Sequence, residues 1–512
     1  MPTIFMTAMR LSKTTIILII LFGLGIFLRL LPIITGNTFF WFDQGLDSIL
    51  VKLLVVDHRI NLTSRYSGLA GVLMGPAYTW MLALPFAISR GDPRSFSIFL
   101  SLLSLFSAGA IYIFIKKIVG VMAALFACAW VLFTPFFIFN STVASSPAPL
   151  TSLFTFFIIF AYKLFVDKKT IFWIPLLFLC GLFFQFEIAF ALFVIPVVLT
   201  FMIIFKSFPN RFFWIGASLF ILTFIPQFLF DLRHNFLITK GFMNLFLGSN
   251  NSLYSNQGSL FARFGERAWS FGDDFLRMAL ITRNPLIVIP IVATMIFGWY
   301  ISNQKNLFKI LLTIITVFYV GLSLYPGPIW DWYRAGLPIV YSLLFVIPLA
   351  AIWEKYKFTR IFIFILLFSI VFKTNYPQTG EYNVSSRKTQ ENILDYVYKS
   401  AEGKPFSYFA YTPPVYDYVW QYDFWQYGKS KYGYLPKNWQ MSIPLLGIGA
   451  QAVAPTNNEG LFFLIMEPNP ERPWERNGWK ESKVGKILET KIFPGDVIVE
   501  KRDSGAAQND DK

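Results

Sequence analysis

Long apolar segments separated by short polar connectors constrain the fold of this chain more than any other feature. The first segment, from Thr14 to Leu31, follows Arg10 and Lys13 and is long enough for a helix to cross a bilayer. Only 14% of the residues are charged and 55% are hydrophobic, whereas soluble domains carry about a quarter charged residues. The sequence therefore predicts an all-α polytopic membrane protein with about 11–13 transmembrane helices and additional juxtamembrane helices.

The predicted spans share high hydropathy and end at polar or basic connectors. After the first, they are 72–88, 95–115, 118–139, 149–166, 171–186, 188–205, 212–230, 285–302, 307–324, 336–353 and 360–372. Basic connectors mark the cytoplasmic side, which places the loops 33–70 and 231–284 outside. Lys116-Lys117 falls on the wrong side by strict alternation, so one segment between residues 72 and 210 is split, re-entrant or not spanning.

The composition changes after this membrane module, which we assign to residues 1–373. Residues 374–503 read as a small extracytoplasmic α/β domain, with a helix near 390–398 and strands near 461–466 and 496–500. Residues 504–512 are polar and are expected to be disordered.

The net charge of +15 indicates anionic lipids or a lipid-linked phosphate as partners, because the basic residues cluster between apolar segments. We expect no nucleic-acid binding. Cys128 and Cys180 lie inside apolar segments and are expected to be core residues. The sequence contains no metal-type cluster of histidine and cysteine, so no cofactor is indicated, although a divalent metal is compatible with the chain.

The motif Trp41-Phe42-Asp43-Gln44-Gly45-Leu46-Asp47 follows the first apolar segment. An ionisable residue at the membrane edge is costly unless it has a partner or a function. The spacing of four puts Asp43 and Asp47 on one face of a short helix. Two interpretations of Asp43 are open: a catalytic carboxylate, or an N-cap of a juxtamembrane helix. For Asp47 an ion pair on the helix face is favoured.

The order of several motifs resembles the GT-C superfamily of integral membrane glycosyltransferases, especially bacterial members akin to protein O-mannosyltransferases and aminoarabinose transferases. The resemblance covers residues 10–372. It depends on the acidic motif, on Gly75-Pro76, on an external turn with Asn140, Ser141 and Pro147, and on Phe230-Asp231-Leu232-Arg233-His234. It implies a GT-C fold and a dolichyl- or polyprenyl-phosphate-sugar donor.

The resemblance also assigns roles to residues. The acid of the first external loop, here Asp43, would be the general base that takes the proton of the acceptor hydroxyl. The second acid of the family motif is replaced by Gln44, which weakens metal binding and leaves the base role intact.

Further residues are candidates for contact with substrate. A leaving phosphate needs positive charge, which Arg233, His234 or Arg334 could supply; the alternative for each is interfacial anchoring. Asp231 is expected to fix the Arg233 side chain. Glu187 either faces the sugar or acceptor cavity or caps a helix junction. Gln44, Asp47 and Arg65 are predicted to line the same cavity.

Taken together, the sequence predicts a glycosyltransferase of the plasma (inner) membrane. It would transfer a sugar from a polyprenyl-phosphate donor to a glycan, lipid or protein acceptor outside the cytoplasm. The alternatives are a transporter or flippase of lipid-linked saccharides and a non-catalytic membrane scaffold. The absence of an internal repeat and the clustering of charges at one face argue against a transporter.

Overall fold

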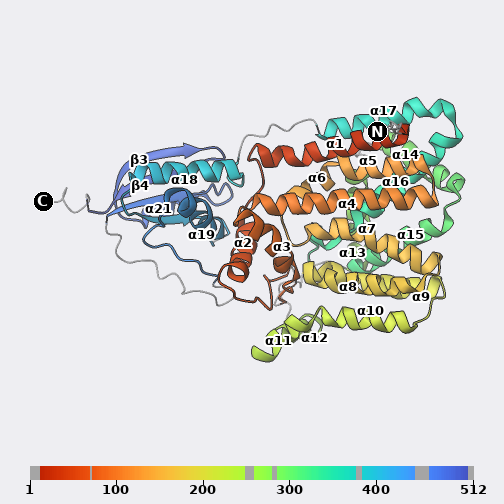
Figure 1. Cartoon of the computed structure of the whole chain (residues 1–512), viewed down its shortest axis with the longest axis horizontal. Helices are drawn as coiled ribbons and strands as arrows, with labels where there is room; N and C mark the ends of the chain where they lie inside the picture. Colours follow the sequence, from red (N-terminus) through yellow and green to blue (C-terminus); the bar gives the residue numbers. More distant parts are fainter. Residues whose placement is uncertain are drawn as a thin grey trace, which may run out of the picture.

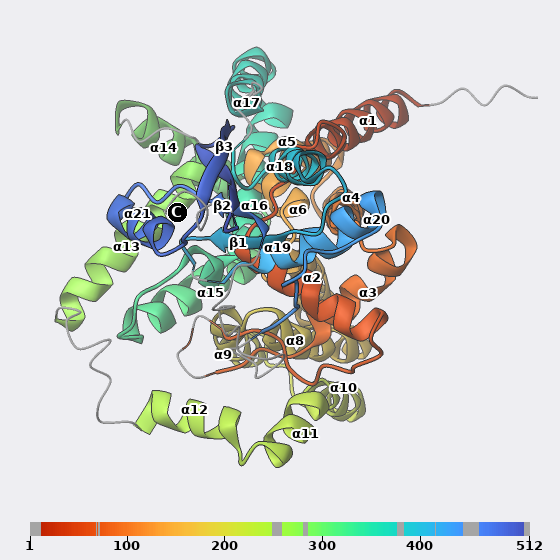
Figure 2. The ribbon, with the colours of Figure 1, turned by 90° about the vertical axis from the view of Figure 1, so that its left-hand side faces the viewer.

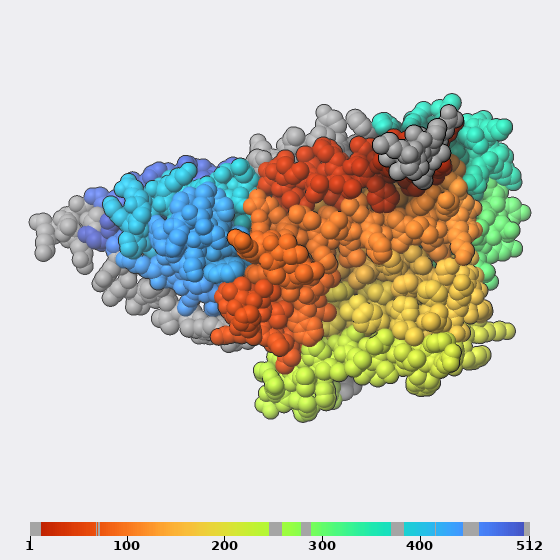
Figure 3. All heavy atoms as spheres, in the orientation of Figure 1, coloured from red at the N-terminus to blue at the C-terminus, as the bar shows by residue number. Residues whose placement is uncertain are grey.

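The computed structural model describes residues 12–67, 69, 72–247, 259–279, 285–375, 383–414, 416–443 and 460–505. A bundle of long helices forms one part of the molecule, and a smaller domain with a β-sheet lies against one end of it (Figures 1 and 3). We call this smaller part the tail domain. The predicted tail of 504–512 lies largely outside the described residues.

The helices of the membrane module occupy most of the chain. They are α1 (Lys13–Ile34), α2 (Phe42–Val55), α3 (Ala77–Ser89), α4 (Arg94–Ile118), α5 (Val121–Phe133), α6 (Pro135–Thr142), α7 (Ala148–Ala161), α8 (Trp173–Phe186), α9 (Ile188–Ile204), α10 (Arg211–Leu222), α11 (Ile225–Arg233), α12 (Leu237–Leu247), α13 (Leu260–Ala279), α14 (Pro285–Ser302), α15 (Lys305–Leu324), α16 (Leu337–Lys355) and α17 (Arg360–Asn375). Short helical turns η1 (Tyr162–Val166), η2 (Thr170–Phe172), η4 (Asp331–Arg334) and η5 (Lys357–Thr359) adjoin them.

The described helices include several that are suited to a bilayer. Five are long and apolar enough to cross it, two bent pairs pass the same test when each is joined, and four shorter helices are also apolar. Many side chains on the outer surface of the bundle are large and apolar, as expected for contact with lipid. The chain is therefore a multi-pass membrane protein, and the predicted fold class is confirmed.

The predicted span 72–88 is wrong. Its helix, α3, has 13 residues, about 20 Å of rise, whereas the hydrocarbon core is about 30 Å thick. Both ends of α3 also lie at the face that carries the tail domain. Before the helix, Met74 N–H bonds to Arg65 O at 3.0 Å in the loop beside α2, and after it Gly91 O accepts from Tyr422 of the tail domain at 2.6 Å.

Removing this span resolves the alternation problem. The helix α4 runs from the tail-domain face to the opposite face (Figure 1), and at its end Ile118 O accepts from Gln304 at 2.9 Å. Gln304 precedes the basic residue Lys305 at the start of α15. Lys116-Lys117 therefore lies with the other basic connectors, and the remaining predicted spans are odd in number.

The bent pair α5–α6 turns by 52° at Thr134-Pro135, where proline lacks the N–H needed to continue the helix. The guanidinium of Arg29 on α1 lies at this break. It donates to Leu132 O at 2.8 Å and to Val131 O at 3.0 Å, two carbonyls at the end of α5. A buried arginine thus satisfies backbone groups that a bilayer cannot.

The tail domain is built on a four-stranded sheet in the order β1-β2-β4-β3. Its elements are α18 (Arg387–Ala401), β1 (Ser407–Tyr411), α19 (Tyr418–Asp423), η6 (Phe424–Gly428), α20 (Lys429–Tyr432), β2 (Leu461–Met466), α21 (Pro473–Glu481), β3 (Lys486–Phe493) and β4 (Val497–Asp503). β1 is parallel to β2, and the other pairs are antiparallel. The predicted helix and both predicted strands are confirmed as α18, β2 and β4.

Alternating residues of β2 face two different layers, as the strand period of two requires. Phe463 and Ile465 pack in a cluster with Ile393 of α18, whereas Leu464 lies in a second cluster with Trp479 of α21. The sheet is therefore covered by a helix on each face, and α19 faces the membrane module.

Candidate active site

The acidic motif forms the N-cap and the start of α2, which lies at the tail-domain face of the bundle (Figure 2). Trp41 is the N-cap, and its N–H donates to Gln44 Oε1 at 3.1 Å. The N-cap interpretation of Asp43 is therefore wrong. Asp43 lies one residue inside the helix, where the positive end of the helix dipole favours a carboxylate.

Arg65 joins the two acids. Its Nη1 lies 2.6 Å from Asp43 Oδ1 and 4.0 Å from Asp47 Oδ2, and its Nη2 donates to Ser146 Oγ at 2.8 Å. The two carboxylates thus share one face of α2, as their spacing predicts. They differ in access, because the Asp43 side chain is 50% exposed and the Asp47 side chain 1%.

The Asp47 side chain is buried. Among the described residues, neither of its carboxylate oxygens has a hydrogen-bond partner. Burial raises the pKa of Asp47 to about 7, although the Arg65 guanidinium acts in the opposite direction. The Tyr78 hydroxyl of α3 is also buried near Asp47. Burial raises the pKa of Tyr78, and the Asp47 charge acts in the same direction. Asp47 is thus the inner acid and Asp43 the outer acid of one cluster.

A short hairpin presents Arg65 to α2. Ser64 N–H donates to Met74 O at 2.8 Å, Met74 N–H donates to Arg65 O at 3.0 Å, and Tyr66 pairs with Leu73. These backbone bonds fix the chain on both sides of the arginine.

Glu187 lies in the turn between α8 and α9, outside both helices. Its Oε1 accepts from Ala189 N–H at 3.3 Å, so the capping interpretation describes its contact. Burial raises the pKa of Glu187 to about 7, with Arg65 acting in the opposite direction. Next to it, Gln185 donates to Gln227 at 2.6 Å. Glu187 is therefore a third buried acid, and the Arg65 charge affects its pKa.

Arg233 and His234 line a separate cavity of about 350 Å³, together with residues 60–63 and Tyr66. The cavity adjoins the hairpin of Arg65, but Asp43 does not line it. The expectation that Asp231 fixes Arg233 is wrong, since the Asp231 carboxylate accepts from the N–H groups of Ile238 and Thr239 at 2.7 and 3.0 Å. Asp231 caps α12, and Arg233 is exposed.

Arg334 is buried, away from this cavity, against the amphipathic helix α13. Its Nη1 lies 3.0 Å from Asp274 Oδ2 and bonds to Ser270, and its Nη2 lies 3.4 Å from Asp331. Burial raises the pKa of Asp274 to about 6, and Arg334 opposes that shift. These contacts favour the anchoring interpretation of Arg334.

Comparison with known proteins places this geometry in context. A family model described as dolichyl-phosphate-mannose-protein mannosyltransferase matches residues 74–230. No curated protein sequence matches the chain. The crystal structure of ArnT from Cupriavidus metallidurans bound to undecaprenyl phosphate is similar, with a TM-score of 0.59 and 10% identity over 96% of this chain and 98% of that chain. The apo state of ArnT gives a TM-score of 0.58 and 10% identity over 96% and 99%.

The chain has the GT-C fold. The resemblance predicted from the acidic motif and the order of the spans is thereby confirmed. The family match over α3 to α11 and the fold together support a membrane glycosyltransferase.

Within this GT-C fold, sequence reasoning missed two residues of the acidic cluster. Ser146 binds Arg65 and directly precedes Pro147 of the external turn, so its place next to that motif was the available signal. Tyr78 follows Gly75-Pro76. Gly75 itself has no room for a side chain, because a Cβ there would lie 1.7 Å from Gln185 Oε1.

The part of this GT-C chain that the structure describes contains no candidate metal site. No group of three or more His, Cys, Asp or Glu side chains is arranged there to hold an ion. The charge next to Asp43 comes instead from a guanidinium.

Proposed function

We propose that this chain transfers a sugar from a polyprenyl-phosphate-linked donor to a hydroxyl of a glycan, lipid or protein acceptor, with Asp43 as general base. The single observation that carries the proposal is the Asp43–Arg65 pair. The Asp43 carboxylate is half exposed at one membrane face and lies 2.6 Å from the Arg65 guanidinium. The two buried acids Asp47 and Glu187 are nearby. Undecaprenyl phosphate bound to ArnT, a protein of similar fold, supports the donor class.

The chemistry balances with the residues present. The acceptor oxygen forms a bond to the anomeric carbon as its proton passes to Asp43. The bond between that carbon and the phosphate oxygen breaks, and polyprenyl phosphate leaves with the electron pair. Arg233 and His234 would meet the phosphate charge from the neighbouring cavity, and Arg65 would hold the Asp43 carboxylate in place.

The membrane placement follows from the same proposal. The basic connectors lie at the face opposite the tail domain, which assigns that face to the cytoplasm. Asp43, the Arg233 cavity and the tail domain would then lie outside the plasma membrane.

The test compares Asp43→Asn with Asp57→Asn, since Asp57 is a surface acid next to the end of α2 that pairs with Lys52 at 2.7 Å. Glycans and glycolipids of the cell envelope are measured by mass spectrometry in cells that express each variant at equal level. We expect the sugar modification to disappear with Asp43→Asn and to persist with Asp57→Asn. A full modification level in Asp43→Asn cells would refute the base role and favour a transporter or a scaffold.

A further inference from the structure

The tail domain contacts the connector that leads into the acidic helix. Arg387 N–H donates to Thr38 O at 3.1 Å, Lys388 N–H donates to Gly36 O at 2.9 Å, and Phe40 N–H donates to Ser385 O at 2.7 Å. The connector between α1 and α2 is therefore paired, along its backbone, with the start of α18. This connector ends at Trp41, two residues before Asp43.

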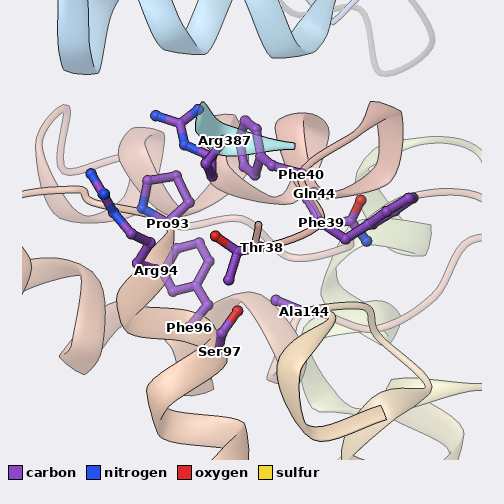
Figure 4. A pocket seen from close by; sticks show the side chains of 10 residues that line it. All are labelled: Thr38, Phe39, Phe40, Gln44, Pro93, Arg94, Phe96, Ser97, Ala144 and Arg387. Atoms are coloured by element: carbon purple, nitrogen blue, oxygen red, sulfur yellow. The ribbon is translucent and has the colours of Figure 1, made fainter. Parts of the chain in front are cut away.

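Side chains reinforce that pairing at one buried point. Arg387 is 1% exposed, its Nη1 lies 2.5 Å from Asp423 Oδ1, and its guanidinium lies 4.9 Å from the centre of the Phe40 ring. Gln390 Nε2 donates to Phe40 O at 2.7 Å. Figure 4 shows Arg387 and Phe40 next to each other, with Gln44 of α2 lining the same small pocket. We call Arg387, Asp423, Gln390 and Phe40 the junction cluster.

The acidic helix itself lies directly on the tail domain. A Cβ on Gly45 would be 2.7 Å from Val419 N, so the backbones of α2 and α19 are in contact between the two acids of the motif. The Phe42 and Tyr418 rings lie 5.1 Å apart. Glycine at position 45 is therefore required by this close approach.

A second link joins the tail domain to the membrane helices. Arg94, at the start of α4, pairs with Glu391 of α18 at 2.8 Å, and Glu391 lies 3.7 Å from Arg387. The junction cluster is thus connected both to α2 and to a spanning helix. A movement of α18 would displace the connector relative to the hairpin that carries Arg65.

We infer that the junction cluster is a positioning element, through which the tail domain holds α2 so that Asp43 and Asp47 face Arg65. This inference rests on the proposed function for its catalytic consequence. Removing one partner of a buried ion pair leaves an uncompensated charge, and a shift of about 1 Å at a catalytic group can lower turnover about 100-fold. The tail domain would then position the two acids of α2.

The test uses full-length protein in detergent, with Arg387→Gln, Arg387→Lys and a matched control. Arg502→Gln is the control, since it breaks another buried pair of the tail domain, Arg502–Glu500 at 2.6 Å, on β4. Turnover and donor KM are measured with an undecaprenyl-phosphate-linked sugar, and hydrogen exchange is measured in peptides of residues 36–50.

We expect Arg387→Gln to lower kcat about 100-fold with donor KM within twofold, and to speed exchange in residues 36–50. Arg387→Lys keeps the charge and should restore part of kcat, and Arg502→Gln should keep both values near wild type. Equal losses of kcat in Arg387→Gln and Arg502→Gln would overturn the inference, as would wild-type kcat and exchange in Arg387→Gln.

If Arg387→Gln does not fold, Gln390→Met carries the test, because it removes the Gln390 side-chain bonds to Phe40 O, Val384 O and Arg387 while keeping the Arg387–Asp423 ion pair. Faster exchange in residues 36–50 with kcat about 10-fold lower supports the inference, and unchanged values refute it. The exchange result stands apart from the proposed function. A wild-type protein without transfer would refute the transferase, whereas faster exchange in the variants would still support the positioning role.

Discussion

Arg29 gives the sharpest prediction about stability, because a charged side chain inside a spanning helix has no anionic partner among the described residues. Its guanidinium makes three hydrogen bonds to other helices, at 2.8 Å to Leu132 O, 3.0 Å to Val131 O and 3.1 Å to Ser104 Oγ. The side chain is 1% exposed. Arg29→Met keeps most of the side-chain length and removes all three bonds.

The magnitude follows from those bonds. Hydrogen bonds between membrane helices contribute about 0.6–1.7 kcal/mol each, so the loss of three predicts about 2–5 kcal/mol of destabilisation. The charge penalty largely cancels, because Arg29 is in the bilayer in both the separated and the packed state of α1. The two carbonyls at the α5–α6 break would remain unsatisfied in the variant, since Pro135 cannot donate to Val131 O.

The assay is thermal unfolding in detergent, followed by tryptophan fluorescence. The control is Ile19→Met, which places the same residue on the same helix at a position that is 58% exposed. We expect Arg29→Met to unfold at a clearly lower temperature than both wild type and Ile19→Met. An unfolding temperature equal to that of the control would show that Arg29 does not stabilise the broken span.

Two further predictions address the acidic cluster and the cavity beside it. The raised pKa of Asp47, about 7, means that its proton is bound more tightly in the folded chain, so stability falls as pH rises from about 4 to about 7. Between pH 5 and pH 8, the Asp47→Asn variant should lose less stability than wild type, measured by unfolding at each pH. An equal loss of stability in the two proteins would contradict the burial of Asp47. Arg233→Gln should weaken binding of undecaprenyl phosphate about tenfold, because it removes a charge-assisted contact, while Arg211→Gln on α10 should not. Equal affinities in the two variants, measured by titration of the purified protein, would remove Arg233 from the phosphate site.

The membrane fold was largely predictable, because the hydropathy of long segments depends on local sequence alone. Helices α4, α15 and α16 lie where apolar segments predict them. One exception among the described helices, α3, is equally apolar but ends after 13 residues. Its role as a non-spanning helix depends on contacts with Tyr422 and the Arg65 hairpin, which hydropathy does not encode.

The candidate site was predictable only in part. The spacing of Asp43 and Asp47 predicts their shared face, because a helix has 3.6 residues per turn. The partner of both acids, Arg65, is brought there by a hairpin, and Ser146 by the turn before α7. Arg334 shows the opposite case: its position at the membrane edge suggested a phosphate contact, but it pairs with Asp274 of α13.

The arrangement of the two acids explains why one guanidinium can serve both. Asp47 is buried and has a pKa of about 7, so near neutral pH its charge is only partly present next to Arg65. Asp43 lies closer to the same guanidinium, at 2.6 Å compared with 4.0 Å, and half of its side chain is open to an incoming acceptor. When Asp47 is protonated, Arg65 pairs with the Asp43 carboxylate alone. When Asp47 is ionised, the two carboxylates compete for Arg65. In the proposed mechanism, Asp43 takes the acceptor proton, and the charge of Asp47 sets how strongly Arg65 holds Asp43.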